Sequence, residues 1–168
     1  MDDIARRAQL DRASVYYYFK GKKEIFREII EDATINNVER AECIAQSEQP
    51  SADKLRLLIK DLFEIYERHY PYIYIYLQED MGRLLQDESK WSREVRALNR
   101  RFDAAVMRII KEGIEGGAFK TDGDPRLVVN GIVGMCNWSH RWFKPNRRYQ
   151  AEQIANVFAD MIIGGLAR

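Results

Sequence analysis

The sequence predicts an all-α fold, with a helix-turn-helix domain at the N-terminus followed by a larger helical domain. Only 4 Pro and 10 Gly occur in 168 residues, and 46% of the residues are hydrophobic, as in a globular helical chain. One segment, residues 70–76, alternates like a strand, but no second strand candidate exists to pair with it. The clearest helical stripe repeats apolar residues at three- and four-residue steps, at Leu55, Leu58, Ile59, Leu62, Phe63 and Tyr66.

Local start and stop signals divide the chain into eight helices. Asp11 is a suitable N-cap for the second helix, and Pro50-Ser51 ends one helix and caps the next. Pro71 suits the first turn of a helix, so we expect residues 70–76 to be helical. Gly116-Gly117 supplies a C-cap, and Asp124-Pro125 begins the helix that follows. The expected helices are 2–8, 12–19, 22–45, 52–69, 70–76, 88–115, 125–142 and 149–166.

Bulk composition limits the classes of protein that the chain can belong to. The formal net charge of +1 does not by itself indicate a nucleic-acid binder, so the placement of the charges must decide. Cys43 and Cys136 lack CxxC spacing, and we expect both to be small buried residues in a reducing cytoplasm. No run of about 18 apolar residues occurs, so no membrane contact is expected. Residues 1–3 do not resemble a signal peptide, and the expected location is cytoplasmic.

The first two short helices, joined by a tight turn, have the pattern of a helix-turn-helix, whose second helix enters the major groove of DNA. Between residues 5 and 27 there are seven basic and two acidic residues, a local balance of +5. Such a concentration of charge favours phosphate binding, because each neutralised phosphate releases counterions. Residues that we expect to face inward or fill the corner are Ile4, Ala5, Ala8, Leu10, Val15 and Phe19.

A signature within this region resembles the DNA-binding domain of the TetR family. It comprises Asp3-Ile4-Ala5, Ala8 and the Ser-Val-Tyr-Tyr-Tyr-Phe-Lys-Gly-Lys-Lys-Glu-Ile-Phe stretch of residues 14–26. The resemblance implies that Arg12, Ala13 and Tyr16 contact base edges or thymine methyl groups. It also implies phosphate contacts from Ser14, Tyr17, Tyr18 and Lys22. The alternative is that the tyrosines form an aromatic core patch and the basic residues a solvated face.

The chain departs from the family pattern in two ways. Gln9 stands at the turn where the family usually has Gly, which predicts a strained or differently shaped corner. The family's first helix would precede residue 1, so the resemblance implies that the DNA-binding domain, residues 1–30, is incomplete at its N-terminus. The resemblance assigns the remaining residues, 31–168, to ligand binding and dimerisation.

The last two helices are unusually apolar and rich in small residues, and a helix that is apolar around much of its circumference must be covered on several sides. We expect them to pair with the same helices of a second copy in a two-fold, four-helix interface. The alternative is burial within one subunit. The residues concerned are Gly131, Gly134, Met135, Ala155, Ala159, Ile162, Ile163, Gly164 and Gly165.

A ligand pocket is expected among the middle helices, with aromatic and methionine walls suited to an apolar molecule. From Pro125 to Ala151 there is no acidic residue, and together with residues 74–81 this stretch resembles TetR members that respond to acyl-CoA thioesters. The alternatives are that these side chains are plain core and that Arg141 pairs with Glu79 or Asp80. The candidates are Phe63, Tyr66, Tyr72, Tyr76, Met81, Phe102, Met107, Trp138, Arg141 and Trp142.

The resemblance therefore implies a dimeric regulator, expected to be a repressor, that an apolar ligand releases from operator DNA. In such dimers the two recognition helices are about 34–36 Å apart, and the ligand is expected to change this spacing. No cofactor or metal is expected. As an enzyme the chain would have only Cys43 or Cys136 as nucleophile and His69 or His140 as base, without an oxyanion or glycine-rich loop. A third possibility is a helical interaction protein that binds no ligand.

Overall fold

The computed structural model describes residues 1–80, 89–145 and 147–167. Over these residues the predicted all-α class is confirmed, and no strand is present apart from one isolated bridge between Phe119 and Ala167. The elements are α1 (Asp2–Ala8), α2 (Arg12–Tyr18), α3 (Lys22–Gln46), α4 (Ser51–Arg68), α5 (Tyr72–Ile75), the π-helix η1 (Tyr76–Asp80), α7 (Lys90–Glu115), α8 (Pro125–Trp138), the 3-10 helix η2 (Ser139–Arg141) and α9 (Ala151–Leu166).

Short-range sequence signals fix several helix ends. The side chain of Asp11 accepts a hydrogen bond from the Ser14 amide at 2.8 Å, as expected of the N-cap of α2. Asp124 accepts from the Arg126 amide in the same way at the start of α8. Gly117 has a φ of 75°, the left-handed conformation that ends α7. Because these signals act within a few residues, they can be read from the sequence.

The segment with strand-like alternation is helical in the part that the structure describes. Pro71 precedes the first residue of α5, and the chain continues without a break into η1. Ile73 and Tyr74 are buried, whereas Tyr72 and Ile75 are exposed. The buried and exposed sides of this short helix each carry one tyrosine and one isoleucine, so the alternation along the sequence does not separate the two sides.

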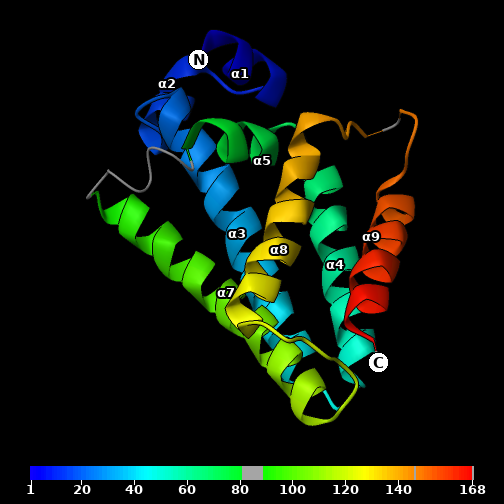
Figure 1. Ribbon diagram of the computed structural model, residues 1–168. Coiled ribbons are helices and arrows are strands. Elements are labelled where there is room, and N and C mark those ends of the chain that lie inside the picture. Colours follow the sequence, from blue (N-terminus) through cyan, green and yellow to red (C-terminus); the bar gives the residue numbers. More distant parts are fainter. Residues whose placement is uncertain (81–88, 146, 168) are drawn as a thin grey trace.

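Long helices surround one core, with the two short N-terminal helices at one end (Figure 1). α4 packs against α9, and α3 packs against both α7 and α4. α7 and α8 also pack together, and the turn that joins them lies at the end of the molecule opposite α1 (Figure 1). The largest fully buried side chains are Phe63, Phe119, Ile30, Leu55, Ile59, Ile109 and Ile110. None of the described helices is long and apolar enough to span a membrane.

Three burial predictions are wrong. Ala8 is exposed and Leu10 is 51% exposed, because no other described segment covers this side of α1 and the turn. Cys43 is exposed rather than buried, since its neighbours Ala41 and Ile44 occupy the inner face of α3 and position 43 points the other way. Cys136 is fully buried as expected, and burial raises the pKa of its thiol to about 12.

Candidate functional site

α2 presents its tyrosines to solvent. Tyr17 is 83% exposed and Tyr18 is 71% exposed, whereas Val15 on the opposite side is only 5% exposed. The rings of Tyr17 and Tyr18 meet edge to face, with centroids 5.0 Å apart. Exposure of large aromatic side chains costs solvation free energy, so an exposed pair favours a surface that meets a partner. This arrangement differs from the aromatic core patch of the alternative interpretation.

The turn before α2 is held by specific local contacts. Gln9 adopts a left-handed conformation with φ 57°, where the predicted signature usually has Gly. Asp11 accepts hydrogen bonds from both the amide and the hydroxyl of Ser14, the latter at 2.7 Å. These two bonds lower the pKa of Asp11, so its carboxylate stays charged at the N-terminus of α2. The hydroxyl of Ser14 therefore already has an acceptor within the protein.

Arg12 is the exposed cation at the start of the same helix. Its Nε lies 3.3 Å from Asp2 Oδ1, and its guanidinium lies 5.3 Å from the centre of the Tyr16 ring. Both contacts are at the surface and cost little to exchange, because exposed ion pairs and cation–π contacts are weak. Arg12 is thus oriented along α2 but remains available to a stronger partner.

The seven predicted DNA-contacting residues lie together at one end of the molecule. Six belong to α2, and Lys22 is the first residue of α3 (Figure 1). All except the half-buried Ser14 are exposed. The surface that they form carries cations and aromatic rings, which are the groups that bind phosphates and base edges.

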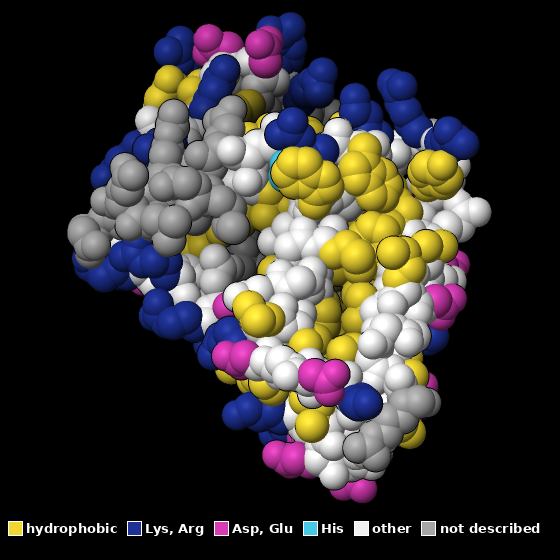
Figure 2. Space-filling view, in the orientation of Figure 1, with side chains coloured by type: hydrophobic (Ala, Val, Ile, Leu, Met, Phe, Trp, Pro, Cys, Tyr) yellow, Lys and Arg dark blue, Asp and Glu magenta, His cyan; other side chains and the backbone are white. Residues whose placement is uncertain are grey.

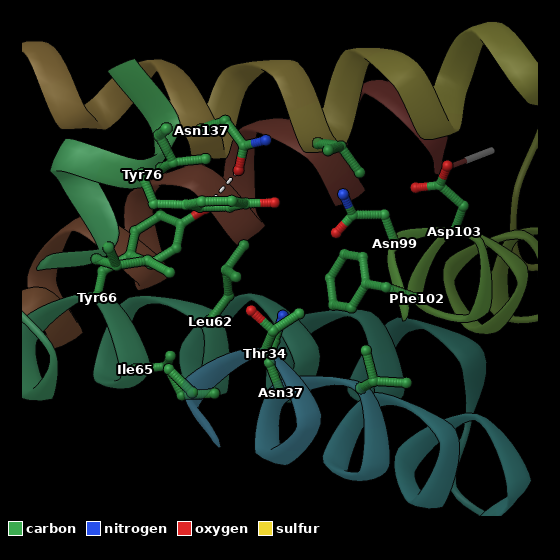
Figure 3. Close-up of a pocket in the computed structure, with 15 residues that line it drawn as sticks. Thr34, Asn37, Leu62, Ile65, Tyr66, Tyr76, Asn99, Phe102, Asp103 and Asn137 are labelled. Carbon is green, nitrogen blue, oxygen red and sulfur yellow. Dashed lines mark hydrogen bonds between the residues drawn. The ribbon is translucent and has the colours of Figure 1, made fainter. Parts of the chain in front are cut away.

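A cavity of about 290 Å³ lies in the middle of the larger helical region, bordered by α3, α4, α5, η1, α7 and α8. Figure 3 shows its side chains converging from these helices. Its volume is at the lower end of the range for small-molecule sites. The lining is Ala33, Thr34, Asn37, Val38, Leu62, Ile65, Tyr66, Ile73, Tyr76, Leu77, Asn99, Phe102, Asp103, Val133 and Asn137.

The cavity wall combines apolar surface with a few polar groups. The hydroxyl of Tyr66 donates a hydrogen bond to Asn137 Oδ1 (Figure 3). The side-chain amides of Asn37 and Asn99 form no hydrogen bond within the described part of the chain, and both lie at the cavity (Figure 3). Burial raises the pKa of Asp103, and the nearby Arg126 opposes that shift. These groups can recognise carbonyl or hydroxyl oxygens on a mainly apolar ligand.

Of the ten predicted ligand residues, Tyr66, Tyr76 and Phe102 line this cavity. Phe63 is fully buried beside it and packs edge to face on Tyr66, which makes it core. Tyr72 is 43% exposed. Met107 lines a separate open groove along α7. Met81 lies outside the described residues.

The three asparagines at the cavity, Asn37, Asn99 and Asn137, were not predicted from the sequence. An amide on an amphipathic helix is ordinarily assigned to the solvated face, so composition gives no reason to place it inside. A usable signal does exist for Asn99, which lies one residue after the buried Leu98 and one turn before Phe102. A polar residue within an apolar stripe indicates a polar contact inside the bundle.

The remaining three predicted ligand residues lie away from the cavity. Trp138 is 60% exposed and Trp142 is 43% exposed. The guanidinium of Arg141 lies over the Trp138 ring at 5.1 Å. Arg141 also lines a second, shallower space of about 270 Å³ next to α5, together with Tyr70 and Lys144. The basic stretch after α8 is therefore not the rim of the cavity in Figure 3.

An apolar surface extends over α8 and α9. Figure 2 shows hydrophobic side chains gathered along both helices and in the furrow between them. At Gly131 and Gly134 of α8, an added Cβ would meet no atom within 4 Å, so the backbone there is open to close approach. The large exposed side chains on these helices and the loop between them are Leu127, Trp138, Trp142, Tyr149, Val157 and Met161. A patch of this composition is typical of a protein–protein interface.

Both the N-terminal helix-turn-helix region and the larger helical region match models of known protein families. A family model described as "Bacterial regulatory proteins, tetR family" covers residues 1–29, and one described as "Tetracyclin repressor-like, C-terminal domain" covers residues 48–166. The transcriptional repressor KstR2 of Mycolicibacterium smegmatis is 28% identical over 99% of this chain and 80% of its own length.

Solved structures share the fold. The regulator PfmR from Thermus thermophilus superposes with a TM-score of 0.83 at 28% identity, over 99% of this chain and 88% of its own. AibR, solved with isovaleryl coenzyme A and operator DNA, has a TM-score of 0.74 at 19% identity, covering 95% and 84%. FadR from Bacillus subtilis, solved with stearoyl-CoA, has a TM-score of 0.71 at 22% identity, covering 98% and 87%.

Proposed function

The chain belongs to the TetR family of transcriptional regulators, and we propose that it is a homodimeric repressor that an acyl-CoA thioester releases from operator DNA. The relatives that match it along almost its whole length are transcriptional regulators. We assign DNA binding to residues 1–30 and ligand binding with dimerisation to residues 31–168. Under this proposal the protein acts in the cytoplasm, needs no cofactor and catalyses no reaction.

The DNA contacts that we propose use the exposed side of α2. Arg12 and Ala13 are proposed to read bases because they begin the helix that would enter the major groove, and Tyr16, which Arg12 contacts, is proposed to do so one turn later. Tyr17, Tyr18 and Lys22 are proposed to hold phosphates. Ser14 is proposed to act in the same way after exchanging its bond to Asp11.

The dimer that we propose forms through α8 and α9. Its support is the exposed apolar surface over these helices and the open backbone at Gly131 and Gly134 (Figure 2). Burying this surface removes apolar area from water at about 25 cal/mol per Å², which favours association. A two-fold axis through this surface would hold the two copies of α2 at a fixed spacing on DNA.

The effector that we propose has a compact acyl group that enters the central cavity. The acyl-CoA complexes of AibR and FadR support the ligand class. The cavity volume of about 290 Å³ and the unpartnered amides of Asn37 and Asn99 favour a short or oxygen-bearing acyl group over a long saturated chain.

One observation supports coupling between ligand binding in the cavity and DNA binding by the helix-turn-helix. α3 is continuous from Lys22 to Gln46, so one rigid helix starts at a proposed phosphate contact and also borders the cavity with Ala33, Thr34 and Asn37. A ligand that pushes on α3 therefore changes the orientation of the helix-turn-helix that precedes it. Because a ligand shifts an equilibrium only by its difference in affinity for the two states, the ligand must fit the released arrangement better.

The proposal is tested by fluorescence anisotropy with a labelled duplex taken from upstream of the protein's own gene. The protein expressed from its complete reading frame is expected to bind this duplex in a salt-sensitive manner, and isovaleryl-CoA is expected to weaken binding more than stearoyl-CoA or free CoA. A lack of binding to the duplex would refute the repressor role. Binding that no acyl-CoA weakens would refute the effector class alone.

A further inference from the structure

A basic loop lies between α8 and α9 and takes no part in the cavity. Its cations are Arg141, Lys144, Arg147 and Arg148, which are all exposed. Arg141 and Arg148 stack on the rings of Trp138 and Tyr149, at 5.1 Å each. None of the four has an ion-pair partner among the side chains that the structure describes.

The basic loop carries positive charge that no acidic residue on the same segment balances. The sequence from Pro125 to Ala151 contains no acidic residue, so the loop has no neighbouring carboxylate on its own segment. Several cations on the long helices are instead paired, as Arg101 is with Glu42 and Arg40 with Asp61. Uncompensated cations repel one another, which costs free energy unless an anionic partner binds.

The basic loop faces the same end of the molecule as the helix-turn-helix. In Figure 1, α1 and α2 lie at the top of the view, and the chain between η2 and α9 also runs along the top. Figure 2 shows dark-blue side chains extending along this end, from the N-terminal helices to the region before α9. Below them lies the apolar surface of α8 and α9 (Figure 2).

We propose that the basic loop is a second DNA-backbone contact, which binds phosphates at the centre of the operator between the two recognition helices. The inference rests on the proposed dimer, because an axis through α8 and α9 brings the loops of both copies to the middle of the DNA-facing surface. The duplex there carries one negative charge per about 1.7 Å of its axis. Such contacts add affinity and fix orientation but carry no sequence information.

The test compares two variants that lose the same charge. The loop variant carries Lys144→Gln, Arg147→Gln and Arg148→Gln, and leaves Arg141 on Trp138. The control variant carries Lys111→Gln, Lys120→Gln and Arg126→Gln, which are exposed cations on α7, on the chain after it and at the start of α8. Binding to the upstream duplex and to an unrelated duplex is measured between 50 and 200 mM salt, and sedimentation gives the oligomeric state.

We expect both variants to remain dimers. The slope of log K against log salt should become shallower by about 1.8 or more in the loop variant, which corresponds to one lost phosphate contact per subunit. Over this salt range the wild type would then lose about tenfold more affinity than the loop variant. Preference for the upstream duplex should be unchanged.

Equal slopes for the two dimeric variants would overturn the second contact and leave the repressor role intact. A loop variant that keeps the wild-type slope but loses its response to acyl-CoA would also overturn it, and would instead assign the loop to the effector's phosphates. If the wild type itself fails to bind either duplex, the proposed function fails before the loop is tested.

Discussion

The guanidinium of Arg27, near the start of α3, lies 5.0 Å from the centre of the Trp91 ring, near the start of α7. The Nε atom of Arg27 is buried and has no hydrogen-bond partner among the described residues. The ring face is therefore a favourable contact for this cation. The contact joins the helix that follows α2, with its proposed DNA contacts, to a helix that lines the cavity.

Replacing Arg27 with Met should keep the packing of the stem and remove the cation–π contact. The free energy of unfolding should fall by about 1 kcal/mol, measured by urea denaturation. Arg100→Met, at an exposed position on α7, is the matched control and should change stability little. Equal losses for the two variants would show that the Trp91 contact contributes nothing.

The ion pair between Lys54 and Glu112 gives a prediction that depends on pH. Lys54 is 5% exposed, and its Nζ donates to Glu112 Oε2 at 2.8 Å and to the carbonyl of Ala45 at 3.1 Å. Glu112→Gln leaves this buried cation without its carboxylate and should cost about 2 kcal/mol at pH 7, allowing for the partial exposure of Glu112. Bonds from Arg108 and Lys54 lower the pKa of Glu112 below its usual 4.5.

Because the folded-state pKa of Glu112 is lowered, its contribution to stability is present above the unfolded pKa of 4.5 and is lost as the pH falls through the folded value. The stability difference between wild type and Glu112→Gln should therefore shrink as the pH falls below about 4.5. Denaturation curves from pH 7 to pH 3 measure it. A difference that stays constant over this range contradicts the assigned role of the carboxylate.

The dimer surface can be tested at a glycine. An added Cβ at Gly134 meets no atom within 4 Å in one subunit, and the position is exposed, so Gly134→Leu should fold. Replacing a helical glycine should also favour the helix by about 0.5–1 kcal/mol. The same side chain would obstruct close approach of a second copy. Sedimentation should therefore show a weaker dimer and an unchanged or higher unfolding temperature. A dimer of wild-type affinity would place the interface elsewhere.

The proposed DNA surface gives different expectations for Arg12 on α2 and Lys22 at the start of α3. Arg12→Ala should weaken operator binding by about 1–3 kcal/mol per site and reduce the preference for operator over unrelated DNA. Lys22→Ala should weaken binding to both duplexes alike and make the salt slope shallower by about 1 per subunit. If Arg12→Ala reduces binding to both duplexes equally, Arg12 contacts phosphates rather than bases.

The sequence predicts the helices and the helix-turn-helix because their signals are local. Asp11 caps α2 through Ser14, three residues away, and the left-handed turn at Gln9 follows from the family pattern. The cavity is less accessible to sequence reasoning. Helical periodicity shows that Tyr66 and Phe102 are buried, but it does not show which buried residues border a space.

Two groups of residues illustrate why the lining of the cavity could be predicted only in part. Trp138 and Trp142 have the aromatic side chains expected of a pocket wall, yet they lie on the outer surface of the α8–α9 region. The face on which a residue lies depends on tertiary packing, which the sequence pattern does not show. Asn37 and Asn99 resemble surface residues in the sequence, but their helices are surrounded on that side. Composition alone cannot separate an interface from a cavity when both are aromatic.

The central claim is that a ligand inside the cavity controls DNA binding, and a cavity-filling variant tests it most directly. Val133→Phe adds volume at the cavity wall without touching the surface of α2. Anisotropy titrations of the operator complex with isovaleryl-CoA should show release of the wild type, while Val133→Phe binds DNA normally and is not released. Release of both proteins at the same ligand concentration would contradict the account.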